Sequence, residues 1–311
     1  MRHIDPPGYR HEALFYRGDE EFLAGTVPLV RDAVDADAAV LVAVPRSRSR
    51  ALREALGRDG EAVSFAEMEE LGRNPGRIIG AWRDFIREHA GGDVPPLGIG
   101  EPIWPERTEA ELVECQRHET LLNLAFAPET PWTLLCPYDT GKLAPEVIRA
   151  ARRNHPHLVE HGETHRSESY VREIPAFEPL PAPSSDAAEL RFGTGELARV
   201  REFLAERAAQ AGIEGQRLAD LVLAVHELAG NSLRYARGEP TLRTWREDGS
   251  LLAEIADAGH IADPLAGRDL PGPGEISGRG LYLVNQLCDL VQLRSSPDGS
   301  VVRVHMRISD N

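Results

Sequence analysis

Three short segments in the last third of this 311-residue chain carry residue types suited to binding a metal and a nucleotide. The first is Glu227-Leu228-Ala229-Gly230-Asn231, within a predicted helix. The i,i+4 spacing puts Glu227 and Asn231 on one helix face. Because the neighbours Leu221, Val225 and Leu228 are apolar, both polar groups lie near a core and need partners. A hydrated divalent cation would supply them; the alternative is a polar pair on the helix surface.

The second segment, Asp257-Ala258-Gly259, ends a predicted strand. An acidic side chain that leaves a strand can accept a hydrogen bond from an exocyclic amine. A glycine two residues later lets the backbone approach a flat base closely. Taken alone, these residues are equally typical of a turn at a strand end.

The third segment, Gly278-Arg279-Gly280-Leu281, opens a predicted helix. Glycines at a helix start let backbone amides converge on an anion, which the helix dipole also favours. The preceding loop, residues 257–277, is long and rich in glycine and proline. Loops of this length are usually functional lids or disordered linkers.

The elements around these segments predict an α+β domain of two layers. A strand at 189–192 precedes helices at 194–212 and 216–237. A hairpin around Gly249 follows, and a second hairpin occupies residues 291–308. Helices segregated from antiparallel strands form this architecture.

The order of these pieces resembles the Bergerat-fold ATP-binding domain shared by gyrase, histidine kinases and mismatch-repair ATPases. The resemblance covers about residues 188–308, and the short build is most similar to the anti-sigma serine kinases of bacteria. It implies ATP and Mg²⁺ as cofactors. It further implies that Glu227 polarises the attacking hydroxyl or water, that Asn231 ligates Mg²⁺, and that Asp257 binds the adenine amino group with support from Gly259. The implied phosphate cradle is Gly278, Arg279, Gly280 and Leu281.

Two departures from that family pattern leave alternatives open. Many relatives have a glycine where this chain has Ile261, so a non-catalytic interaction switch, with or without nucleotide, is an alternative to a kinase. A third alternative is an orphan histidine kinase. This chain shows no phosphoacceptor helix of the kind that a histidine kinase needs. Pro156 and Gly162 break the segment that contains its clustered histidines, His155, His157, His161 and His165. We interpret those histidines as solvated polar residues; the minor alternative is a metal-binding or phosphoacceptor role.

The first half of the chain predicts an α/β domain with a mostly parallel sheet. Strand-like runs alternate with amphipathic helical segments, which is typical of a sheet covered on both faces. The expected strands are 12–16, 38–45, 62–65, 96–100 and 132–139, and the expected helices are 19–35, 47–57, 75–90, 108–125 and 145–153.

Several segments of this half, among them HEALFY, GIGEPIW and ECQRHETLLNLAF, resemble the MEDS sensory domain of actinobacterial regulators over about residues 8–155. The resemblance implies a fold related to RecA-like ATPases and a small organic ligand. The first strand–helix turn, residues 17–21, has no phosphate-binding motif. Because ligands of such sheets bind beyond the carboxyl ends of the strands, the candidate ligand residues are Arg17, Asp19, Arg46, Glu101, Trp104, His118, Tyr138 and Asp139. The alternative is a domain that only mediates protein contacts.

A proline-rich stretch separates the two halves. We predict a sensory domain at 1–173, an extended linker at 174–188 and an ATPase domain at 189–311. Stiff φ angles and few amide donors favour an extended linker.

The net charge and the cysteine content limit the classes of function that the chain can have. With 35 Lys+Arg against 50 Asp+Glu, the formal net charge is −15, which disfavours direct nucleic-acid binding. Cys115, Cys136 and Cys288 show no metal-ligand spacing and are expected to be buried, reduced thiols. No signal peptide or membrane span is evident, so a cytoplasmic protein is expected.

Together with the resemblances, these features imply a signal-responsive anti-sigma regulator. The expected partners are a sigma factor, a STAS-type anti-anti-sigma protein that would be the substrate of a serine kinase, and a second copy in a homodimer.

Overall fold

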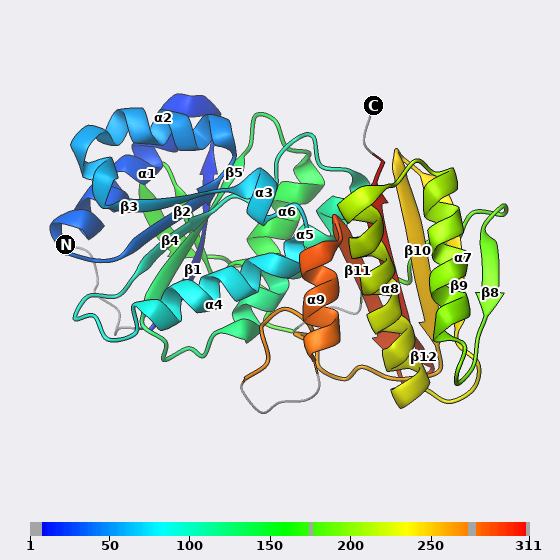
Figure 1. The fold of residues 1–311 in the computed structure, drawn as a ribbon. Coiled ribbons are helices and arrows are strands. Elements are labelled where there is room, and N and C mark those ends of the chain that lie inside the picture. The colour runs from blue at the N-terminus through cyan, green and yellow to red at the C-terminus, as the bar shows by residue number, and fades with distance from the viewer. Residues whose placement is uncertain (1–7, 174–176, 273–277, 309–311) are drawn as a thin grey trace. The chain divides into compact units, whose positions relative to one another are not determined.

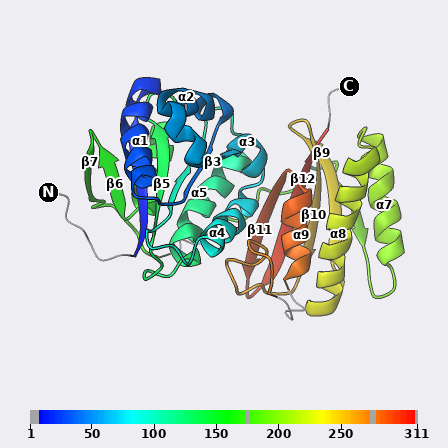
Figure 2. The ribbon, with the colours of Figure 1, turned by 60° about the vertical axis from the view of Figure 1, so that its left-hand side comes forward.

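The computed structural model describes residues 8–173, 177–272 and 278–308. The chain forms two compact units, Met1–Ile174 and Pro175–Asn311. Figures 1 and 2 show the strands and helices of each unit from two directions.

Unit 1 contains a seven-stranded sheet in the order β3-β2-β4-β5-β1-β6-β7. All neighbouring pairs are parallel except β6 and β7, which are antiparallel. The mostly parallel sheet predicted from the sequence is confirmed. Its strands are β1 (Tyr9–Tyr16), β2 (Val40–Val44), β3 (Val63–Glu67), β4 (Leu97–Gly100), β5 (Trp132–Asp139), β6 (His157–Glu160) and β7 (Glu163–Arg166).

Helices cover both faces of this sheet (Figure 1). On one face, Leu14 and Ile99 of the strands pack with Phe22 and Leu52 of the helices in one apolar cluster. On the other, a Cβ at Gly100 would lie 2.8 Å from the Trp82 ring, so the helix that carries Trp82 lies directly on the sheet. The helices are α1 (Gly18–Asp35), α2 (Arg46–Leu56), α3 (Met68–Leu71), α4 (Ile78–Glu88), α5 (Glu109–Ala125) and α6 (Pro145–Asn154), with 3-10 turns η1 (Gly57–Ala62) and η2 (Pro75–Arg77).

Unit 2 is an antiparallel sheet in the order β11-β12-β10-β9-β8 with helices on one face (Figure 2). Leu221 and Leu228, Val284 and Val304 belong to its apolar core. This is the predicted α+β two-layer architecture. Its elements are β8 (Ala188–Arg191), α7 (Leu197–Gln210), α8 (Gly215–Tyr235), β9 (Thr241–Glu247), β10 (Ser250–Asp257), α9 (Arg279–Leu287), β11 (Leu290–Ser296) and β12 (Gly299–Arg307).

The described part of the proline-rich stretch, residues 177–187, belongs to unit 2 and bonds to two arginines of its sheet. Arg303 donates a 2.6 Å hydrogen bond to the Pro181 carbonyl, and Arg294 donates a 2.9 Å bond to the Glu178 carbonyl. This segment has no regular secondary structure. Its backbone carbonyls therefore accept hydrogen bonds from side chains and not from a neighbouring strand. Pro175 of the predicted linker lies outside the described residues.

Two expectations for unit 1 were wrong in detail. The region around residues 157–166 forms the β6–β7 hairpin. His155 just before it is fully buried, which corrects the expectation of a solvated side chain, whereas His161 and His165 are exposed as expected and His157 is half-buried. The helix predicted over 75–90 begins as the η2 turn and becomes α-helical only at Ile78. No helix in the described parts of the chain combines the length and apolarity that a membrane crossing requires.

Candidate functional site

The start of helix α9 lies directly against Glu227 and Asn231 of helix α8. A Cβ atom at Gly280 would lie 2.9 Å from Glu227 Oε2 and 3.1 Å from Asn231 Nδ2. Glu227 and Asn231 are both half-buried, one helical turn apart. Only a residue without a side chain leaves the carboxylate and the amide in these positions. The structure therefore brings together two of the three sequence segments, which lie about 50 residues apart.

Asp257 joins the same neighbourhood at the end of strand β10. Its Oδ2 accepts a hydrogen bond from the hydroxyl of Ser232, the residue after Asn231 on α8. Its Oδ1 accepts a 2.7 Å hydrogen bond from the Gly259 amide. A Cβ at Gly259 would lie 2.9 Å from that same oxygen, so a larger residue would displace the carboxylate. Sequence reasoning found Asp257 and Gly259 but missed Ser232.

The loop after β10 is fastened to the sheet and to α9. The Ser295 hydroxyl accepts a 2.8 Å hydrogen bond from the Ile261 amide. Asn285 of α9 donates a 2.9 Å hydrogen bond to the Gly267 carbonyl. Gly267 has φ +76°, and a Cβ there would meet Leu281 at 2.7 Å, so the loop backbone packs on the first turn of α9. Residues 273–277, the rest of the predicted lid, lie outside the described residues.

Gly278 caps α9 in the left-handed region, at φ +95°. That conformation is open to glycine without steric cost and turns the chain into the helix. The exposed Arg279 follows it, and Leu281 packs against the apolar core. Backbone N–H groups in the first turn of a helix have no partner within the helix and attract anions. Taken together, the segments form a site with two carboxylates, an amide and a helix N-terminus, groups whose chemistry fits a nucleotide phosphate with Mg²⁺.

A second group of charged residues lies at the carboxyl ends of the strands in unit 1. Arg48 of α2 forms an ion pair with Asp19 and donates a 3.0 Å hydrogen bond to Asp139 Oδ2. Tyr16 donates a 2.6 Å hydrogen bond to Glu101 Oε1, and Arg48 lies 5.0 Å from the centre of the Tyr16 ring. Burial raises the pKa of Glu101 to about 8. These five residues, the Arg48 cluster (Tyr16, Asp19, Arg48, Glu101 and Asp139), thus form a network of hydrogen bonds and ion pairs, in which the buried Glu101 Oε2 has no hydrogen-bond partner among the described residues.

This cluster contains three of the eight candidate ligand residues. Arg17 is close to it: a Cβ at Gly141 would lie 3.2 Å from both Arg17 Cγ and Asp139 Oδ1. The other candidates are distributed elsewhere in unit 1. Arg46 is exposed and paired with Glu67, and the Trp104 ring lies under the guanidinium of Arg107. His118 and Tyr138 are buried.

Sequence reasoning missed Tyr16 and Arg48, although both lie at or just beyond the carboxyl end of a strand. Tyr16 is the last residue of β1, and Arg48 lies in the first turn of the helix that follows β2. The rule that ligands bind beyond the carboxyl ends of strands would have selected both.

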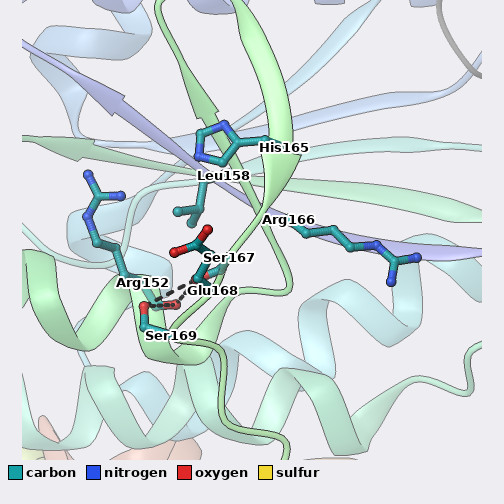
Figure 3. Close-up of a pocket in the computed structure, with 7 residues that line it drawn as sticks. All are labelled: Arg152, Leu158, His165, Arg166, Ser167, Glu168 and Ser169. Carbon is teal, nitrogen blue, oxygen red and sulfur yellow. Dashed lines mark hydrogen bonds between the residues drawn. The ribbon is translucent and has the colours of Figure 1, made fainter.

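A surface pocket of unit 1 lies beside the β6–β7 hairpin (Figure 3). Its polar groups bind one another: Ser167 Oγ donates a 2.5 Å hydrogen bond to the Arg152 carbonyl, and Arg152 pairs with Glu160. The pocket contains none of the predicted site residues. Its lining residues are Arg152, Leu158, His165, Arg166, Ser167, Glu168 and Ser169.

Each half of the chain matches the model of a known domain family. Residues 10–156 match the MEDS model, the methanogen/methylotroph DcmR sensory domain, and residues 192–306 match the model of the histidine kinase-like ATPase domain. Both family resemblances found in the sequence are confirmed. No curated protein matches the chain.

Solved structures that resemble part of the chain include the following two. The RsbU and RsbW domains of Rv1364c from Mycobacterium tuberculosis are 18% identical, with a TM-score of 0.32, over 42% of this chain and 34% of that one. The histidine kinase AdeS of Acinetobacter baumannii is 12% identical, with a TM-score of 0.25, over 40% of this chain and 68% of that one. This chain thus spans about a third of the length of the mycobacterial protein that it matches.

Proposed function

We propose that this chain, a MEDS sensory domain joined to a histidine kinase-like ATPase domain, is a signal-responsive regulator of transcription that acts through proteins. In this proposal the ATPase domain binds ATP with Mg²⁺, inhibits a sigma factor and phosphorylates a serine of a STAS-type anti-anti-sigma partner. The sensory domain controls it. Such control requires a ligand that binds one arrangement of the protein more tightly than another.

The single observation that carries the proposal is the contact of Gly280 with both Glu227 and Asn231. In this contact the N-terminus of α9, which would bind the phosphates, lies next to the carboxylate of Glu227 and the amide of Asn231, which would take part in phosphoryl transfer. Phosphoryl transfer depends mainly on positioning and on neutralising charge. A site that fixes these groups side by side before nucleotide arrives is suited to it.

Each residue has one proposed task. Glu227 accepts the proton of the attacking serine hydroxyl, and Asn231 holds Mg²⁺, which neutralises the phosphate charge. Asp257, fixed by Ser232, accepts from the adenine amino group. The N–H groups of Gly278, Arg279 and Gly280, with Leu281 anchoring their helix to the core, bind the phosphates.

The net charge of −15 supports protein partners over DNA. Sigma factors carry basic DNA-binding surfaces, and complementary charge steers such partners together. We place the protein in the cytoplasm, where these partners occur, and propose that it acts as a homodimer.

The test is transfer of label from ATP. The full chain is incubated with labelled ATP, Mg²⁺ and a candidate STAS-type partner, and serine labelling is measured. Labelling is expected with wild-type protein and lost in Glu227→Ala. Glu214→Ala, at the exposed N-terminal cap of the same helix, is the matched control and keeps activity. If the protein binds nucleotide but labels none of the partners, the proposed kinase activity is wrong.

A non-catalytic switch is the second candidate because Ile261 replaces a glycine common in relatives. In the structure the Ile261 amide is bound to Ser295, so this part of the loop is held in place. Calorimetry with ATP and ADP separates the forms of this alternative: binding without transfer supports a nucleotide-gated switch, and no binding supports a nucleotide-free one. Acid-labile labelling of a histidine would instead indicate a histidine kinase.

A further inference from the structure

Four polar side chains from separate segments meet inside unit 1, beside the candidate residue Tyr138, whose ring centre lies 5.6 Å from that of His155. They are His11 of β1, Glu119 of α5, Cys136 of β5 and His155, which directly follows α6. None is more than 1% exposed. One nitrogen, oxygen or sulfur atom of each lies within 4.8 Å of those of the other three.

The hydrogen bonds of both histidines fix which ring nitrogen carries the proton. His155 Nδ1 lies 2.8 Å from the Ala151 carbonyl, which can only accept. His11 Nδ1 lies 3.1 Å from Asn123 Oδ1. The Asn123 amide is oriented by its nitrogen, which donates a 2.7 Å bond to the Asn154 carbonyl, so its oxygen faces His11. Each imidazole therefore donates through Nδ1 and presents a lone pair at Nε2 when it is neutral.

Both lone pairs point at the same carboxylate oxygen. Glu119 Oε2 lies 3.2 Å from His11 Nε2 and 3.2 Å from His155 Nε2. Apart from this approach, His155 Nε2 has no hydrogen-bond partner within the described chain. Within the described chain, the His155 Nε2 lone pair faces this buried anion with no donor, and the His11 Nε2 lone pair has only the Cys136 thiol, at 3.4 Å, so the arrangement is unfavourable. A cation between the three atoms removes the conflict.

The sulfur of Cys136 completes the arrangement, 3.4 Å from His11 Nε2. Tetrahedral zinc has bonds of roughly 2.0–2.3 Å, which imply ligand–ligand separations of about 3.3–3.8 Å. Of the six separations among the four ligand atoms, three are 3.2, 3.2 and 3.4 Å, close to that range, and all six are within 4.8 Å. We propose that His11, Glu119, Cys136 and His155 bind a divalent transition-metal ion, zinc by the chemistry of the ligands.

The ligand set selects the metal class. Two imidazoles, a thiolate and a carboxylate suit zinc, whereas Mg²⁺ and Ca²⁺ require mainly oxygen ligands. The partners of the two Nδ1 atoms, a backbone carbonyl and an amide, are those that orient metal-binding histidines. Four protein ligands fill a tetrahedral shell, so the ion would tie β1, α5, β5 and the end of α6 together. This site is independent of the proposed ATP site.

The test is metal binding by the full chain. Protein purified without chelator and exposed to Zn²⁺ is expected to hold about one zinc per chain by mass spectrometry, as a closed four-ligand site does. Cobalt substitution is expected to add a thiolate-to-cobalt charge-transfer band and tetrahedral d–d bands. Cys136→Ser is expected to lose the charge-transfer band, and Glu119→Gln to lower the metal content.

Two further variants keep the test decisive if a ligand variant misfolds. Cys288→Ser removes a buried cysteine of unit 2 and is expected to leave the spectrum unchanged. Asn123→Ala leaves all four ligands in place and is expected to weaken metal binding roughly 10–100-fold. Folded wild-type protein that takes up neither zinc nor cobalt overturns the proposal. So does a cobalt spectrum that Cys136→Ser does not change.

Discussion

The hydroxyl of Ser232 donates a hydrogen bond to Asp257 Oδ2, which joins helix α8 to the end of strand β10. Ser232 is buried and adjacent to Asn231, so this one bond aligns the proposed adenine acceptor with the proposed metal ligand. Hydrogen bonds to charged groups contribute about 1.5–3 kcal/mol.

We expect Ser232→Ala to weaken ATP binding about tenfold, the equivalent of 1.4 kcal/mol, because Asp257 loses a partner that fixes its orientation. Isothermal titration calorimetry with ATP and Mg²⁺ measures the change. Ser167→Ala, a serine of unit 1 that bonds the Arg152 carbonyl, is the matched control and should leave the affinity unchanged. Equal affinities for wild type and Ser232→Ala would show that the Ser232 hydrogen bond is not needed to position Asp257 for adenine.

Gly280→Ala tests the contact between α9 and α8. The added methyl group would meet the mobile end of Glu227, which can move away, so overall stability should change little. The displaced carboxylate is no longer aligned, and a misplacement of about 1 Å can lower a rate 100-fold. We expect phosphoryl transfer to fall about 100-fold while the melting temperature stays close to that of wild type.

Gly230→Ala is the control for that variant. Gly230 lies in α8 beside Asn231, and a Cβ there has nothing within 4 Å. Replacing glycine by alanine inside a helix stabilises it by about 0.5–1 kcal/mol. The control should therefore keep its transfer rate and melt slightly higher. If Gly230→Ala loses as much transfer rate as Gly280→Ala, the loss comes from replacing a glycine in this region and not from the contact with Glu227.

The segments of the proposed ATP site could be recognised in the sequence because each carries a distinctive local pattern. Glu227 and Asn231 show helical spacing, and Asp257 and Gly259 follow an apolar strand. Ser232 and Asn285 could not be predicted, since a single polar residue in a helix looks the same whether it faces solvent or a loop. Their tasks depend on which loop returns to that helix face, and this is a property of the tertiary fold.

Long-range assembly also explains what was missed in unit 1. The strands were predictable from continuous apolar runs, whereas β6 and β7 are short and polar. His155 was interpreted as solvated because Pro156 and Gly162 break the segment that contains it. Its burial depends on His11 and Glu119, which are more than 30 residues away in sequence, so no local spacing reveals the cluster.

Gly267→Ala tests whether the loop after β10 depends on α9. Its Cβ would lie 2.7 Å from Leu281 in a left-handed conformation, so both a backbone cost of about 1–2 kcal/mol and an overpacking cost of about 1–3 kcal/mol apply. Gly212→Ala, also at positive φ but with nothing near its Cβ, should show the backbone cost alone. Thermal unfolding of the full chain, followed by circular dichroism, compares the two. Equal destabilisation would contradict close packing of Gly267 on α9.

Glu101→Gln tests the electrostatics of the Arg48 cluster through the pH dependence of stability. Burial is the main reason that the pKa of Glu101 is raised to about 8, and Asp139 acts in the same direction, while the Tyr16 hydrogen bond, Arg48 and Lys142 oppose it. The unfolded chain has a glutamate pKa of about 4.3. The folded state thus holds a proton that the unfolded state has released.

A raised pKa in the folded state gives stability that is complete below about pH 4.3 and is lost as the pH rises to about 8. Between these values wild-type protein should lose up to about 1.4 kcal/mol of unfolding free energy per pH unit relative to Glu101→Gln, whose amide is always neutral. Urea unfolding at about pH 5.5 and about pH 8 measures the difference. Glu106→Gln, at an exposed position, should follow wild type. Parallel pH profiles of wild type and Glu101→Gln would show that Glu101 has the same charge in the folded and unfolded states.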